Sequence, residues 1–111
     1  MAQKRWTFLS NHARVFAYLA EHPDVTAQSL AFKAHLSIRA VQIIMDDLED
    51  GGYLTRERVG RHNRYRVNPD GPLRHSLERG HRAGAILQAL DIKTSGLADS
   101  GSRSNPMVSK A

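Results

Sequence analysis

Three stretches in the first fifty residues carry apolar side chains at helical spacing. In the first, residues 10–22, the side chains expected to face a core are Val15, Phe16, Leu19 and Ala20. They follow the 3.6-residue period of an amphipathic helix. Ser10 precedes the stretch as a cap for free backbone amides, and Pro23 ends it because proline cannot continue a helix.

A second helix is predicted over residues 27–34 and a third over residues 38–50, joined by the tight turn His35-Leu36-Ser37. Thr26 and Ser37 precede these two helices as caps. The side chains expected to face inward are Ala27, Leu30, Ala31 and Ala34, and then Val41, Ile44, Met45 and Leu48. The last four have the i, i+3, i+4, i+7 spacing of one buried stripe. Gly51-Gly52 ends the third helix, since glycine adopts the left-handed closing conformation at little cost.

The apolar period then changes from 3.6 residues to 2. Residues 53–59 and 64–68 are predicted to form two strands around a turn at residues 60–63. The side chains expected to face the helices are Leu54, Tyr65 and Val67, with Arg64 and Arg66 on the other side. Because a two-stranded hairpin is marginal by itself, we expect it to dock on the helices, with a very short third strand at Val25.

Pro69 and Pro72 interrupt the chain after the hairpin. A last helix is predicted over residues 73–90, with Pro72 at its first turn. Residues 91–111 are rich in Ser, Gly, Asp and Asn and poor in large apolar side chains, so they are predicted to be a flexible tail.

Composition narrows the classes of function. The 111 residues fit one domain, and the net charge of +5 favours an anionic partner such as nucleic acid. The absence of cysteine excludes disulfides and cysteine-ligated zinc or iron–sulfur sites, and it suits a reducing cytoplasm. No run of about 18 apolar residues and no signal-peptide pattern occurs, so we expect a cytoplasmic, nucleoid-associated protein without a membrane partner.

The second and third predicted helices have the order of a helix-turn-helix motif, and the following hairpin makes it a winged one. The second helix of such a pair enters the DNA major groove. The outward residues on its first turns are Ser37, Arg39, Ala40, Gln42 and Ile43. Arg39 suits guanine or a phosphate, Gln42 suits adenine, and Ala40 and Ile43 suit thymine methyl groups; the alternative is an ordinary exposed helix face.

Residues 30–69 resemble bacterial winged-helix transcription regulators of the MarR/ArsR type, and the likeness extends over about residues 6–90. The matching positions are Leu30, Ala34, Leu36-Ser37, Arg39, Val41-Gln42, Leu48 and Gly52-Tyr53-Leu54. The resemblance implies a mainly α fold with a small β-hairpin wing and a C-terminal dimerisation helix. It also implies double-stranded DNA binding and control of transcription, with repression expected, by a homodimer on a pseudo-palindromic site. The expected divisions are an N-terminal segment (1–9), the winged helix-turn-helix (10–68), the C-terminal helix (69–90) and the tail (91–111).

The hairpin segment "RERVGRHNRYRV", residues 56–67, contains five arginines and a single acidic residue, Glu57. Charged side chains on an exposed strand also deter aggregation, which is the alternative explanation. We expect contact with the DNA backbone or minor groove from Arg58, Arg61, His62, Asn63 and Arg64. Thr26 and Gln28 are helix-start residues that suit a cap or a phosphate contact. Because Ile43 and Asp46 stand where many relatives carry basic or polar residues, the wing is expected to supply most of the backbone affinity.

The last predicted helix has small and apolar residues along one face. The residues expected to form a dimer seam are Leu73, Leu77, Gly80, Ala83, Gly84, Leu87 and Leu90, with Trp6 and Phe8 joining the same surface. The alternative is that this helix simply covers the three-helix core. A domain of this size often needs the extra burial that a dimer provides.

Other chemistry has little support. The six histidines are scattered without a paired ligand spacing, and His75 and His81 are six residues apart, so no metal site and no cofactor are expected. No cysteine nucleophile, phosphate-binding glycine loop or catalytic carboxylate pair occurs, so no catalytic residues are assigned. A small-molecule effector remains unknown; its pocket would lie between the last helix and the core. The rival function is a winged-helix protein-interaction module without DNA binding.

Overall fold

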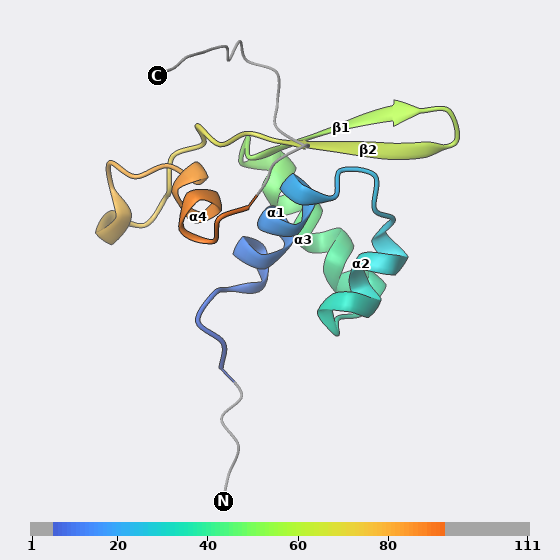
Figure 1. The fold of residues 1–111 in the computed structure, drawn as a ribbon, viewed down its shortest axis with the longest axis horizontal. Helices are drawn as coiled ribbons and strands as arrows, with labels where there is room; N and C mark the ends of the chain where they lie inside the picture. Colours follow the sequence, from blue (N-terminus) through green and yellow to red (C-terminus); the bar gives the residue numbers. More distant parts are fainter. Residues whose placement is uncertain (1–5, 93–111) are drawn as a thin grey trace, which may run out of the picture.

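A computed structural model describes residues 6–92, a mainly α-helical unit with one antiparallel hairpin (Figure 1). Its elements are α1 (Asn11–Glu21), α2 (Ala27–Ala34), α3 (Ile38–Asp50), β1 (Leu54–Val59), β2 (His62–Val67), the 3-10 turn η1 (Ser76–Glu78) and α4 (Gly84–Ala89). The order of helices and hairpin is that of a winged helix-turn-helix followed by a C-terminal helix, which confirms the predicted fold class. The predicted tail lies almost wholly outside the described residues.

The three predicted helix caps are confirmed. The hydroxyls of Ser10, Thr26 and Ser37 accept hydrogen bonds from the amides of residues 13, 29 and 40, at 3.1, 3.0 and 3.0 Å. Each bond satisfies an amide that has no partner within its helix. Gly52, with φ of 85°, lies just beyond the last residues of α3 in the left-handed region, as predicted.

One hydrophobic core joins the helices to the hairpin. The buried apolar side chains come from α1, α2 and α3 and include all the predicted positions of α1 and α3. On α2, Leu30 and Ala31 are buried, whereas Ala27 and Ala34 are half-buried. The hairpin adds Leu54, Tyr65 and Val67, all less than 5% exposed, so the wing is anchored by its base. In Figure 1 its far end extends beyond the helices.

The hairpin is tighter than predicted. Its register runs from Leu54 opposite Val67 to Val59 opposite His62. The connecting turn is therefore Gly60-Arg61 alone, with Gly60 at φ 62°, rather than the four residues 60–63. Two-residue turns require positive φ, and their twist matches that of the paired strands.

The predicted third strand at Val25 is wrong, since the sheet within residues 6–92 has two strands. The free edge of β2 is instead met by a turn: the Tyr65 amide donates to the Pro23 carbonyl at 2.9 Å. The Val25 amide turns back to the His22 carbonyl at 3.3 Å, so it is not available to extend a ladder.

The continuous helix predicted over residues 73–90 is also wrong. The segment folds back on itself: Leu73 bonds to the His81 carbonyl, and Pro72 bridges to Arg82. Pro72 therefore does not start a helix. Gly80, at φ 90°, lies in the turn, and only residues 84–89 are α-helical. Glycine is a poor helix former, and here the return path brings the backbone of residues 83 and 84 onto residues 69–71.

None of the helices within residues 6–92 has the length and apolar character needed to cross a membrane.

Candidate nucleic-acid interface

The start of α2, the exposed side of α3 and the wing enclose a hollow of about 440 Å³. Residues predicted separately to contact DNA come together on its walls, namely Thr26, Gln42, Arg61, His62 and Asn63. They derive from three segments that are up to 37 positions apart, 26 to 63, in the chain. The hollow is the space between the helix expected to enter the major groove and the wing expected to follow the backbone.

The first turns of α3 present polar and small side chains to solvent. Ser37, Arg39, Gln42 and Ile43 are exposed, and Ala40 is half-buried. Gln42 lines the hollow, whereas Arg39 and Ile43 do not. The Ser37 hydroxyl is occupied as a cap, as is that of Thr26 on α2. Gln28 is exposed and does not line the hollow, although its neighbour Ala27 does.

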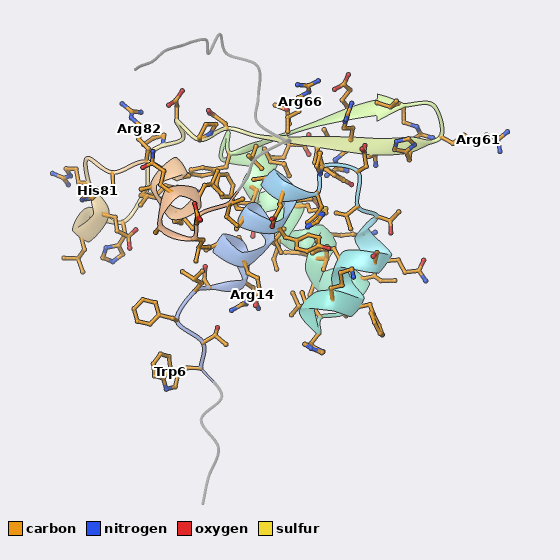
Figure 2. All side chains as sticks on the ribbon, viewed as in Figure 1. Trp6, Arg14, Arg61, Arg66, His81 and Arg82 are labelled. Carbon is orange, nitrogen blue, oxygen red and sulfur yellow. The ribbon has the colours of Figure 1, made fainter. Side chains whose placement is uncertain are left out.

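Arg61 occupies the end of the wing. Its side chain extends away from the rest of the molecule in Figure 2. The neighbouring Arg58 donates from Nε to the Gly60 carbonyl at 3.2 Å. Within residues 6–92 neither guanidinium lies near a carboxylate, so both positive charges at the tip are available to an external anion.

The other wing arginines have acidic partners, although the hairpin segment itself contains only one acidic residue. Arg56 Nη2 lies 3.3 Å from Asp46 and 3.1 Å from Glu49, both on α3. Arg66 pairs with Glu57 across the hairpin at 3.1 Å. The partner of Arg64 is Asp24, at 3.4 Å, and His62 lies 3.7 Å from the same carboxylate. The basic character of the wing is therefore concentrated at its tip.

Arg56 was not among the predicted site residues, yet it connects the wing to α3. It stands opposite Tyr65 in the hairpin register, so its side chain lies on the face that meets the helices. Its guanidinium lies 5.8 Å from the centre of the Tyr65 ring. The acidic half of α3 thus contacts the wing, because Asp46 and Glu49 both form ion pairs with Arg56. The alternation of side chains along the strands, together with the pairing of Arg56 with the buried Tyr65, indicates that Arg56 faces the helices.

The model of the MarR family matches residues 7–64, just over half of the chain. The chain belongs to the MarR family.

Among solved structures, this MarR-family chain is similar to CymR (YrzC), the global cysteine regulator of B. subtilis. The match has 18% sequence identity and a TM-score of 0.46, and it covers 89% of this chain and 76% of CymR. No curated protein matches the chain significantly.

The predicted dimer-seam residues of the MarR-family chain do not form one face. Ala83 and Leu87 are buried in the core of the protomer, at 3% and 5% exposed. Gly84 packs against Pro69, where an added Cβ would lie 2.9 Å from the Pro69 carbonyl oxygen. Gly80 lies in a turn, and Leu73 packs partly on the core. Of the predicted set, Leu77, Gly80 and Leu90 are exposed.

A second hollow, of about 850 Å³, lies between the N-terminal segment and the C-terminal segment of the MarR-family chain. Its walls include Phe8, Phe16, Tyr53, Leu73 and Ile86. The sequence predicted any effector pocket between the last helix and the core, and Ile86 of α4 is on the wall of this hollow. Among the described residues, no group of three metal-ligating side chains lies close enough to hold an ion.

Proposed function

We propose that the chain is a sequence-specific, double-stranded DNA-binding transcription regulator that acts as a homodimeric repressor. The observation that carries this proposal is the convergence of Gln42 on α3 with Arg61, His62 and Asn63 of the wing around one hollow. Membership of the MarR family supports it, since this is a family of transcription regulators. The proposed location is the cytoplasm, on the nucleoid, and no enzymatic step is part of the function.

In the proposed complex, α3 enters the major groove with its N-terminal turns toward the bases. Gln42 bonds an adenine edge, Arg39 bonds guanine or a neighbouring phosphate, and Ala40 and Ile43 contact thymine methyl groups. The wing follows the adjacent backbone, with Arg58 and Arg61 near phosphates or in the minor groove. His62, Asn63 and Arg64 follow the tip along β2, and Thr26 and Gln28 lie at the start of α2.

Two copies are proposed to bind half-sites about one helical turn apart. Support comes from apolar side chains left exposed on the N-terminal segment and on η1: Trp6 is 68%, Phe8 92% and Leu77 86% exposed. Figure 2 shows Trp6 on the N-terminal segment, away from the helical core. Burial of these side chains against a second copy would provide hydrophobic stabilisation that one protomer lacks.

The decisive experiment is selection of bound duplexes from a random pool, followed by a salt titration of the selected duplex. A specific regulator enriches a symmetric sequence, and its affinity falls steeply as salt rises because phosphate contacts release counterions. A winged-helix protein-interaction module, the rival, gives no enrichment. Absence of binding even at low salt would refute the proposal.

A further inference from the structure

Asp24 lies beside β2 of the wing and faces two of the residues proposed to contact DNA. His62 Nε2 lies 3.7 Å and Arg64 Nε 3.4 Å from the same oxygen, Oδ1 of Asp24. Both side chains therefore face the same carboxylate oxygen. Asp24 belongs to the turn between α1 and α2, about 40 positions before the residues that it meets.

The backbone holds Asp24 in this place. Pro23 is buried, and its carbonyl accepts the Tyr65 amide at 2.9 Å, between His62 and Val67 on β2. Tyr65 itself is anchored in the core. The turn is therefore fixed along the outer edge of β2, and the Asp24 carboxylate is held next to the wing rather than reaching it by chance.

The other ion pairs of the wing differ from this one. Asp46 and Glu49 bind Arg56, which is not a proposed DNA contact and faces the helices. Glu57 pairs with Arg66 within the hairpin. Within residues 6–92, the proposed DNA contacts His62 and Arg64 form their ion pairs with Asp24, a carboxylate that lies outside the hairpin. The cationic side chains proposed to contact DNA therefore fall into two groups: Arg58 and Arg61, which have no carboxylate partner within residues 6–92, and His62 and Arg64 on β2, which face Asp24.

A carboxylate and a phosphate compete for the same donors, because guanidinium and imidazolium groups bond either anion with similar geometry. The Asp24 side chain is about half exposed, so its ion pairs are weak and open to exchange. A phosphate that approaches His62 and Arg64 must displace Asp24 and is also repelled by it, since it comes within a Debye length.

We propose that Asp24 is an intramolecular competitor for DNA phosphate: in the free protein it occupies His62 and Arg64 of the wing, and it limits affinity for all duplexes. This inference rests on the proposed function and deepens it. When DNA binds, the displaced carboxylate takes up a cation, which offsets part of the counterion release at the phosphates. Duplexes of every sequence are affected alike, because phosphates carry no sequence information.

The test compares Asp24→Asn with Asp50→Asn in the full chain. Both variants remove one negative charge, but Asp50 lines the second hollow and has no ion pair with the wing. Fluorescence anisotropy is measured with the selected duplex and a scrambled duplex across a salt series. Asp24→Asn is expected to tighten both complexes by about three- to tenfold at low salt. Its salt slope should steepen by about one, while Asp50→Asn changes affinity less than about twofold.

A second arm uses the His62→Ala/Arg64→Ala background. If Asp24 acts through these two residues, Asp24→Asn no longer tightens binding there beyond the effect of Asp50→Asn. Weaker binding by Asp24→Asn with an unchanged melting temperature would overturn the inference, since Asp24 would then position the wing. Equal effects of the two variants, or a gain that persists in the double-alanine background, would overturn it too. If the wild-type chain binds no duplex, the proposed function fails and this inference fails with it.

Discussion

At the scale of single residues, α3 and the wing present different chemistry to the hollow between them. Gln42 offers a planar amide with a donor and an acceptor, whereas Arg61 offers a charge without an acidic partner in the described residues. An amide distinguishes base edges, and a free guanidinium attracts any phosphate. We therefore propose base reading for Gln42 and general affinity for Arg61.

Replacement of Arg61 by alanine should weaken binding to selected and scrambled duplexes to the same extent, by about three- to tenfold at moderate salt. The salt slope should become shallower by about one, because one phosphate contact is lost. Anisotropy titrations at several salt concentrations measure both quantities. Arg79→Ala, in the exposed turn after η1, is the matched control for loss of an arginine. A selective loss for the selected duplex would mean that Arg61 reads bases.

Replacement of Gln42 by alanine should change the preferred sequence and leave affinity for scrambled DNA nearly unchanged. The expected discrimination lost at one base pair is about 1–3 kcal/mol. Selection from a random pool with the variant identifies the position. Since Gln42 is exposed, the melting temperature should be close to that of the wild-type chain. An unchanged base preference would remove Gln42 from the reading surface.

At the scale of elements, the wing depends on the side chains that face the helices. Leu54 is 1% exposed, and its strand neighbour Thr55 lies on the opposite, solvent-facing side. Leu54→Ala should reduce the free energy of unfolding by about 2–4 kcal/mol, because it leaves a cavity under the hairpin. Thr55→Ala should change it by less than about 0.5 kcal/mol. Urea unfolding measures both, and equal losses would indicate that the wing is not anchored through this face.

Also at this scale, the periodicity of residues 10–67 predicted helices and hairpin correctly because the signals are local. The capping residue of a helix, its stripe of buried apolar side chains and the glycine that ends it lie within a short stretch of sequence. Residues 73–90 carry a helical pattern too, but the backbone of residues 81, 83 and 84 hydrogen-bonds to residues 69–73 instead. Such bonds between separate segments leave no trace in a helical period.

At the scale of the whole molecule, the C-terminal segment has a buried part and an exposed part with different expected roles. Leu87 contributes to the core, and Leu77 is 86% exposed. Leu77→Asp should therefore leave the melting temperature of the protomer fold intact and yield monomers in sedimentation. Leu87→Asp should unfold the chain, because it places a charge in the core. If Leu77→Asp retains the wild-type mass, the dimer contact lies elsewhere, or the chain is a monomer.

By itself, the sequence determined the helix-turn-helix, the hairpin and the anionic character of the expected partner. Each follows from spacing and charge over short distances along the chain. The tertiary structure decided which arginines of the wing form ion pairs and which are left without one. The acidic partners Asp24, Asp46 and Glu49 come from other segments of the chain. It also decided that Ala83 and Leu87 pack on the core while Leu77 stays exposed. Both outcomes depend on where distant segments meet, and contact energies between such segments cannot be read from local periodicity.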